Sequence, residues 1–287
     1  METLQLIKNR ISNIAGTRQI TESMRLVSTI KTQKTRVRMS KSQPFLDAAT
    51  QLLHSALSTL HYKSHPYLTK RDGDRTAKGS VAAVVVISGD RGLCGGYNLN
   101  AGKTASELIK SLDGVKIITV GSKARDYCRR RFASRVARSF TGISEKPFYE
   151  NAASIASILL NWYDKKEIDQ AYVVYTKFEN MLIQTPQAVK LLPIDQFTPP
   201  DAQPLTRCEI NQDAFFTQAV TFFITAFIYG ALIESAVCEQ SARVRSMDSA
   251  VDNATEMMEN LTLLYNQARQ SAVTQEIIEI VNGADAI

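Results

Sequence analysis

The sequence predicts an α/β protein in which a long antiparallel coiled coil of N- and C-terminal helices carries a central Rossmann-like α/β domain. Helix-breaking residues are scarce at both ends: residues 207–287 contain no proline, and residues 1–65 have only Gly16 and Pro44 as strong interruptions. Between the ends, β-branched or aromatic runs alternate with helix-like segments, which is typical of a largely parallel sheet covered by helices.

The domain boundaries follow from these changes in pattern. Pro66 ends the first helical pattern, and four prolines between positions 193 and 204 mark a second extended stretch. We expect a shaft helix at 1–65, a linker at 66–79, the α/β domain at 80–192, a linker at 193–210 and a second shaft helix at 211–287.

The N-terminal segment has the hydrophobic spacing of a coiled-coil or bundle helix. Apolar residues recur along it mostly at steps of three and four, at Leu4, Ile7, Ile11, Ile14, Met24, Val27, Phe45, Ala49, Leu52, Ala56 and Leu60. Pro44 lacks a backbone donor, so we expect it to bend the helix or to begin a second one.

Three runs in the middle have the length and composition of buried strands: SVAAVVVIS at 80–88, VKIITV at 115–120 and AYVVYTKF at 171–178. Helical stretches near 101–112, 122–131 and 150–164 separate them. Nearly continuous apolar strands joined by helices indicate a largely parallel sheet that is buried on both faces.

The C-terminal helix is predicted to be unusually long. Asn211 is a good N-cap, Asp213 suits the first turn, and Asn282 with Gly283 is a good stop signal. The span is about 70 residues, or about 105 Å, so the helix needs a partner along its length.

If the N-terminal helix is that partner, the C-terminal helix is longer and overhangs it by about 20 Å. The overhang carries apolar residues on more than one face, so we expect another protein surface to enclose it. These residues are Ile277, Ile278, Ile280, Val281 and Ile287.

The charge distribution favours pairing of the two helices. Residues 1–41 hold nine basic and two acidic groups, whereas residues 213–287 hold ten acidic and three basic groups. A basic helix could also bind nucleic acid, but this one has few aromatic residues for stacking and an acidic companion. We therefore expect no nucleic-acid partner.

Residues 214–233 are uncharged and long enough to cross a bilayer. However, Thr217, Thr221 and Thr225 form one polar stripe, with Val220, Phe223, Ile224, Phe227 and Ala231 on the other side. This pattern predicts an amphipathic helix packed on the α/β domain, and no transmembrane segment.

Candidates for catalysis or cofactor binding are few. Gly102-Lys103-Thr104 matches the end of a phosphate-binding loop motif, but position 97, where that motif requires another glycine, is a tyrosine. The preceding strand also ends too far upstream to lead into such a loop. His61 and His65 lack the glutamate of a hydrolytic zinc helix. The four cysteines are widely spaced, which argues against a disulfide framework or a zinc site and fits a reducing compartment. We expect no active site, cofactor or metal.

Three segments resemble the gamma subunit of F-type ATP synthases: IKNRISNIAGTRQITESMRLVST, SGDRGLCGGYN and EQSARVRSMDSAVDNATEMMENLTLLYNQARQSAVTQEIIEIVNGA. The second departs slightly from the family pattern at Gly89, and the central region is matched more loosely. The resemblance implies a central rotor shaft inside a ring of alpha and beta subunits, with the α/β domain against epsilon and the membrane rotor ring. Its rotation would couple proton or sodium flow to ATP synthesis, while catalysis belongs to other subunits.

The resemblance also implies contact residues. Met24, Arg25 and Arg243 match positions at the beta-subunit lever; Arg269, Gln270 and Thr274 match positions facing another beta-subunit loop, and Cys94 lies in a turn near the beta subunits. Cys208, Glu209 and Ile210 correspond to the part facing the rotor ring and epsilon.

The N-terminus carries no targeting segment, so a bacterial enzyme is favoured, peripheral on the cytoplasmic face of the plasma membrane. No closely spaced cysteine pair matches the regulatory dithiol of chloroplast members. The alternative is a nucleotide-binding α/β enzyme with a coiled-coil dimerisation arm.

Overall fold

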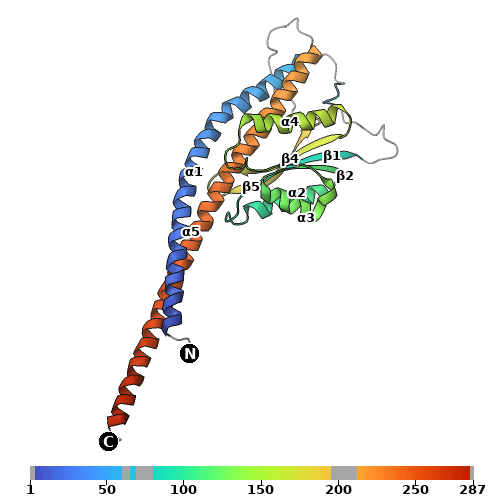
Figure 1. Ribbon diagram of the computed structural model, residues 1–287. Helices are drawn as coiled ribbons and strands as arrows, with labels where there is room; N and C mark the ends of the chain where they lie inside the picture. Colours follow the sequence, from blue (N-terminus) through green and yellow to red (C-terminus); the bar gives the residue numbers. More distant parts are fainter. Residues whose placement is uncertain (1–3, 60–64, 69–79, 195–211, 285–287) are drawn as a thin grey trace. The chain divides into compact units, whose positions relative to one another are not determined.

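The computed structural model describes residues 4–59, 65–68, 80–194 and 212–284 (Figure 1). The two long helices are α1 (Leu4–Thr59) and α5 (Gln212–Ala284). The chain forms two compact units. We call Met1–Thr29 with Arg243–Ile287 the paired-helix unit and Ile30–Ala242 the α/β unit. Each long helix runs through both units.

The α/β unit contains a five-stranded sheet in the order β3-β2-β1-β4-β5. Its strands are β1 (Val81–Ile87), β2 (Gly114–Val120), β3 (Val136–Phe140), β4 (Gln170–Phe178) and β5 (Gln184–Leu192). The first four are mutually parallel, and β5 is antiparallel to β4. The expected largely parallel sheet is therefore confirmed.

The sequence pattern did not reveal β3 and β5, and both lie at the edges of the sheet. The middle of β3 is exposed, so it lacks the apolar run of a central strand. β5 contains Pro186, which is tolerated because an edge strand leaves one side of its backbone unpaired. Edge strands need less apolar surface, and hydrophobic pattern alone detects them poorly.

Helices cover both faces of the sheet (Figure 1). On one face, α2 (Tyr97–Lys110) and α3 (Ser122–Phe132) bury Ile109 and Cys128 against Val84 and Ile117. On the other, α4 (Tyr149–Asp164) and the first part of α5 pack against Val85. Neighbouring residues of β1 thus point to opposite cores, which explains its continuous apolar sequence.

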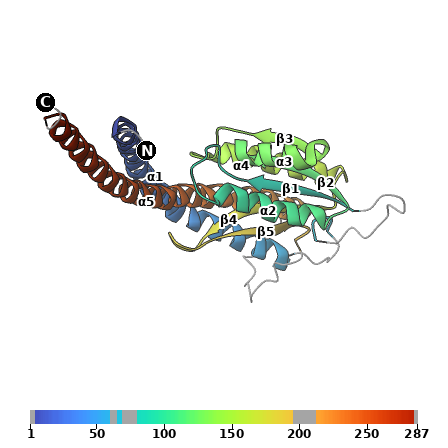
Figure 2. The same ribbon diagram turned by 90° about the horizontal axis from the view of Figure 1, so that it is seen from below.

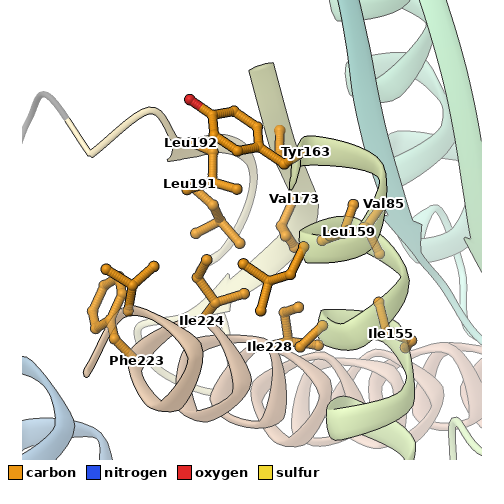
Figure 3. Packing of buried hydrophobic residues seen from close by; sticks show 14 of the residues in the cluster. Val85, Ile155, Leu159, Tyr163, Val173, Leu191, Leu192, Phe223, Ile224 and Ile228 are labelled. Atoms are coloured by element: carbon orange, nitrogen blue, oxygen red, sulfur yellow. The ribbon is translucent and has the colours of Figure 1, made fainter. Parts of the chain in front are cut away.

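The apolar start of α5 is part of the second core (Figure 3). Phe223, Ile224 and Ile228 lie against Leu159 of α4 and Val173 of β4. By length and hydropathy α5 is the one helix of the described chain that could cross a bilayer, but 67% of its apolar window is buried within the fold. The predicted packing of this segment on the α/β domain is confirmed.

The threonine stripe of α5 satisfies its own hydroxyl groups. Thr217, Thr221 and Thr225 each donate a hydrogen bond to the backbone carbonyl four residues earlier, at 2.8–2.9 Å. These bonds let polar side chains line a helix whose opposite side is fully apolar.

α1 continues through Pro44, so no second helix begins there. Residues 65–68 form a turn, in which the Leu68 N–H donates to the His65 carbonyl oxygen at 2.9 Å. Most of the two expected linkers lies outside the described residues. The predicted N-cap Asn211 also lies outside them, and α5 extends one residue past Gly283.

Candidate functional site

The paired-helix unit brings the two ends of the chain side by side. The Arg25 guanidinium lies 3.2 Å from an Asp248 carboxylate oxygen, and the Arg18 guanidinium donates to the Thr255 hydroxyl at 3.5 Å. Arg18 precedes Arg25 on α1, whereas its partner Thr255 follows Asp248 on α5 by the same number of residues. The helices are therefore antiparallel, and the predicted pairing of a basic with an acidic helix is confirmed.

The same register locates the end of the overlap. Extrapolated along the two helices, it places Leu4 opposite Arg269, so α5 beyond this point has no described α1 residue beside it. Figures 1 and 2 show α5 continuing past the start of α1. The 15 remaining residues to Ala284 correspond to an overhang of about 22 Å.

The overhang leaves its apolar side chains in contact with solvent. Every described side chain from position 273 to 282 is exposed, and Ile280 reaches 71%. Among the residues implied by resemblance, Arg269, Gln270 and Thr274 are also exposed, at the start of this segment. Apolar side chains that face solvent over a wide sector of a helix mark a surface that another protein covers.

The other implied residues of this unit are less accessible. Met24 and Arg25 are half-buried, and Arg243 is only 5% exposed. Arg25 also lies 3.7 Å from Glu22, so its charge is shared between two carboxylates. The pair with Asp248 is partly solvated and contributes mainly to register, since such pairs contribute little to stability.

A tight turn at residues 88–97 follows β1 at the carboxyl edge of the sheet. The Asn98 side chain organises it by accepting from the Gly89 N–H at 2.8 Å and donating to the Arg91 carbonyl oxygen at 3.1 Å. The Asn98 amide also donates to the Cys94 sulfur at 3.0 Å. Cys94 is 1% exposed and packs with Cys238 of α5, so its thiol faces the interior.

The exposed part of this turn consists of its neighbouring side chains. Leu93 is 62% exposed and has a positive φ of 60°. Arg91 is also exposed and lies 3.4 Å from Glu145, whose other partner is Lys31 of α1 at 3.1 Å. Glu145 thus ties the turn to α1.

Asp90 joins three segments at this edge. Its carboxylate accepts from the Ser122 N–H at 2.9 Å, at the start of α3, and from the Ser144 N–H at 3.1 Å. Burial by itself raises the pKa of Asp90. Hydrogen bonds from the backbone of Gly142, Ser144 and Ser122 and from the Ser144 hydroxyl outweigh it and hold the pKa below its ordinary value.

The absence of a side chain at Gly89 has a packing reason. A Cβ atom there would lie 2.7 Å from the carboxyl carbon of Glu239, a fully buried residue of α5. The Glu239 carboxylate therefore occupies the space that a side chain at Gly89 would need. This contact joins the segments SGDRGLCGGYN and EQSAR, which are far apart in the sequence.

The residues considered for phosphate binding do not form a loop. Gly102, Lys103 and Thr104 lie within helix α2. A Cβ atom on Gly102 would lie 2.8–2.9 Å from the Tyr127 ring of α3, so this glycine allows two helices to approach closely. The part of the chain that the structure describes holds no cluster of three or more residues suited to bind a metal ion.

Several residues that organise the site were not singled out from sequence, including Asp90, Asn98 and Glu145. The first two lie within SGDRGLCGGYN, so the motif itself was the available signal. Cys208, Glu209 and Ile210 lie outside the described residues.

Paired long helices with an exposed apolar end, together with an α/β domain, are typical of a protein that works through contact with other proteins. A family model described as ATP synthase matches residues 3–287, and the chain belongs to this family, among the ATP synthase gamma chains. The gamma chain of Alkaliphilus metalliredigens is 35% identical over 99% of this chain and 98% of its own. The sodium-ion-specific gamma chain of Acetobacterium woodii is 33% identical over 100% and 99%.

Solved structures show the same fold. A chain of the mitochondrial ATP synthase of Euglena gracilis (OSCP, F1 and c-ring) superposes with a TM-score of 0.71 at 20% identity, covering 99% of this chain and 94% of that one. A chain of the central stalk and c-ring of the Tetrahymena thermophila enzyme gives a TM-score of 0.60 at 20% identity, covering 80% and 99%.

Proposed function

We propose that this chain is the central rotor shaft of an F-type ATP synthase, which couples ion-driven rotation to conformational change in the catalytic beta subunits. The observation that carries the proposal is the α5 overhang, whose exposed apolar residues cover a wide sector of the helix and need a partner surface. A ring of alpha and beta subunits provides such an enclosure. Family membership supports this assignment.

The shaft acts by presenting different side chains to similar neighbours as it turns. A rotor favours some angular positions only if its contacts differ between them. The candidate contacts are Met24, Arg25 and Arg243 at one level of the paired helices and Arg269, Gln270 and Thr274 at another. Because Met24, Arg25 and Arg243 are partly or largely buried in the chain itself, Arg269, Gln270 and Thr274 offer more of their surface to a partner.

The turn at residues 88–97 is a further contact with the beta subunits in this proposal. Cys94 acts there through position and packing, because its thiol is buried. Arg91 and Leu93 are the side chains that a neighbouring subunit would touch. Asp90 and Glu145 hold them in place through the hydrogen bonds and ion pairs described above.

The remaining partners follow from the same assignment. The segment with Cys208, Glu209 and Ile210 faces the rotor ring and epsilon, and the complex is attached to the cytoplasmic face of a bacterial plasma membrane. The chain itself catalyses nothing and binds no cofactor. One similar relative, the gamma chain of Acetobacterium woodii, is sodium-ion specific, so either protons or sodium ions fit the proposed coupling.

Co-purification tests the proposal. A tagged chain should bring alpha and beta subunits with it, and removal of residues 275–287 should weaken ATP-driven ion pumping by the membrane-bound complex. The matched variant Lys103→Gln, changed in the exposed part of α2, should leave both unchanged.

Two results would contradict the proposal. One is purification of the chain without alpha or beta subunits. The other is saturable ATP binding by the isolated chain that Lys103→Gln abolishes, which would favour the nucleotide-binding enzyme instead.

A further inference from the structure

Five exposed arginines lie in the segment that leads from α3 into the edge strand β3. We call them the arginine cluster: Arg129, Arg130, Arg131, Arg135 and Arg138. Residues 122–140 contain seven basic groups and one acidic group, an excess equal to the formal net charge of +6 of the whole chain. The acidic group, Asp126, already pairs with Arg125 at 3.0 Å. Within the described residues no carboxylate pairs with the five arginines.

The fold itself uses only part of this charge. Basic residues in the last turn of α3 complement the helix dipole, which amounts to about half a charge. Arg131 lies 4.1 Å from the centre of the Tyr127 ring. Arg138 lies in the middle of β3, where a charge discourages unwanted strand pairing. Mutual repulsion within the cluster opposes folding, so the excess charge indicates an anionic partner outside the chain.

Strand β3 leaves one side of its backbone open. It is the outermost strand of the order β3-β2-β1-β4-β5 and pairs only with β2. Ala137, Arg138 and Ser139 are all exposed, so no described part of the chain covers the strand. Figure 2 shows β3 at the outer side of the sheet, beside α3.

The backbone of Ser139 faces this open side. The Gly121 N–H donates to the Phe140 carbonyl oxygen at 2.8 Å, so Phe140 directs its backbone groups toward β2. Consecutive residues of a strand direct their N–H and C=O groups to alternate sides, so those of Ser139 point away from β2. The Ser139 hydroxyl accepts from the Thr119 hydroxyl at 2.9 Å, which holds this residue in position. A strand added at this edge would meet the Ser139 N–H and carbonyl oxygen.

We propose that the open edge of β3 and the arginine cluster together bind an acidic, extended segment of another protein, which adds to the sheet as a further strand. A segment that pairs with an open sheet edge gains backbone hydrogen bonds, and its side chains provide the specificity. Guanidinium groups bind carboxylates through paired hydrogen bonds, so the arginines select acidic side chains. This inference goes beyond the proposed function and does not depend on it.

The surface favours an acidic peptide over a nucleic acid or polyphosphate. Phosphate groups at neutral pH offer few donors for the open carbonyl groups of a strand, whereas a peptide supplies both donors and acceptors. Single-stranded nucleic acids also bind by stacking on exposed aromatic side chains. No large apolar or aromatic side chain between residues 122 and 140 is exposed. The surface therefore offers charge and an open strand edge, and both match an acidic strand.

Fluorescence anisotropy of the full-length chain with labelled peptides tests the inference. The probe is a short peptide of alternating glutamate and valine, which favours an extended conformation. A second peptide has glutamine in place of glutamate and lacks the charge. A third keeps every glutamate but is N-methylated through its central part, so it lacks the backbone donors that strand pairing needs.

One pair of variants tests the charges. The cluster variant keeps Arg131, which contacts Tyr127, and carries Arg129→Gln, Arg135→Gln and Arg138→Gln. The control removes the same number of exposed charges from α1 through Lys8→Gln, Lys34→Gln and Lys41→Gln. Exposed ion pairs contribute up to about fivefold each, so the cluster variant should bind the glutamate peptide about tenfold more weakly. The α1 control should lose less than about twofold, because its charges lie elsewhere.

A second pair tests the backbone. Ser139→Pro removes the N–H that points away from β2 and leaves the hydrogen bonds to β2 in place, as edge strands permit. Ser139→Ala loses the same hydroxyl but keeps the N–H. The proline variant should bind at least about fivefold more weakly, whereas the alanine variant should stay within about twofold of the unchanged chain.

The unchanged chain should bind the glutamate peptide, less tightly at high salt, and should bind neither the glutamine peptide nor the N-methylated one. Binding of the N-methylated peptide as tightly as the parent would overturn the inference, because charge alone would then explain it. Absence of binding by the unchanged chain, equal losses in the cluster and α1 variants, or equal competition by polyphosphate of the same charge would also overturn it. Tryptophan fluorescence checks that each variant is folded; if Ser139→Pro is not, the N-methylated peptide decides.

Discussion

Gly121 holds the turn at residues 88–97 in place through close backbone packing, and Gly121→Ala tests this. The residue lies between β2 and α3 with φ +92° and ψ 144°, a conformation open almost only to glycine. A Cβ atom there would overlap the Ser88 carbonyl oxygen and lie 2.9 Å from that of Gly89. Both atoms belong to the backbone, so the clash cannot be relieved by a side-chain rotation.

The magnitude follows from two separate effects. An alanine in this backbone region costs about 1–3 kcal/mol. Relief of the overlap must also move the end of β1, where the Ser88 N–H donates to the Val120 carbonyl oxygen at 2.9 Å and Gly89 accepts from the Lys123 N–H at 3.1 Å. Loss of these two bonds adds about 1 kcal/mol each, so the total is about 4 kcal/mol.

Gly142→Ala is the matched control. Gly142 has φ +78°, but a Cβ atom there meets nothing within 4 Å. It should therefore cost only the backbone strain, about 1–2 kcal/mol. The comparison separates the effect of the clash from that of the dihedral angle.

Guanidinium unfolding followed by tryptophan fluorescence measures both variants. The single tryptophan, Trp162 of α4, packs against the core of the α/β unit and reports its unfolding. We expect Gly121→Ala to lower the free energy of unfolding by at least about 2 kcal/mol more than Gly142→Ala. Equal effects of the two variants would refute the proposed packing of the turn.

Three further predictions concern the cores and the paired helices. Burial raises the pKa of Glu234 from 4.5 to about 7, and Lys177 opposes this only in part, so the folded state holds the proton more tightly and stability falls as pH rises through this range. Glu234→Gln should flatten this pH dependence in thermal melts between pH 4.5 and 8, and an unchanged slope would contradict the assignment. Phe223→Ala removes a side chain that is 1% exposed and should cost about 3–5 kcal/mol by tryptophan-monitored unfolding, whereas a loss below about 1 kcal/mol would show that the core re-forms around the gap. A double-mutant cycle on Arg25 and Asp248, read by circular dichroism, should give a coupling of only about 0.2–1 kcal/mol because both groups are partly exposed, and a much larger value would indicate a desolvated pair.

The central strands could be predicted because their signal is local. In β1, every residue from Ala82 to Ile87 is buried, so the strand reads as a continuous apolar run wherever it pairs. The edge strands β3 and β5 carry no such run. Their place in the sheet depends on hydrogen bonds to β2 and β4, which the sequence does not display.

The contact surfaces were predicted less completely than the fold. The resemblance located the motif around Cys94, but it could not show that the thiol is buried while Leu93 is exposed. Nor did it indicate that Glu145 links Arg91 to Lys31, because these residues come from three separate segments. Such links arise only when the segments meet in the fold.

The sequence by itself determined the two long helices, the parallel α/β sheet between them and the opposite charges of the helix ends. These features depend on which residues break helices, on the period of apolar residues and on net charge, and all three are properties of neighbouring positions. Tertiary structure alone decided the register of Arg25 with Asp248, the contact of Gly89 with Glu239 and the accessibility of each motif residue. The reason is that burial depends on contacts between distant segments, which no local pattern records.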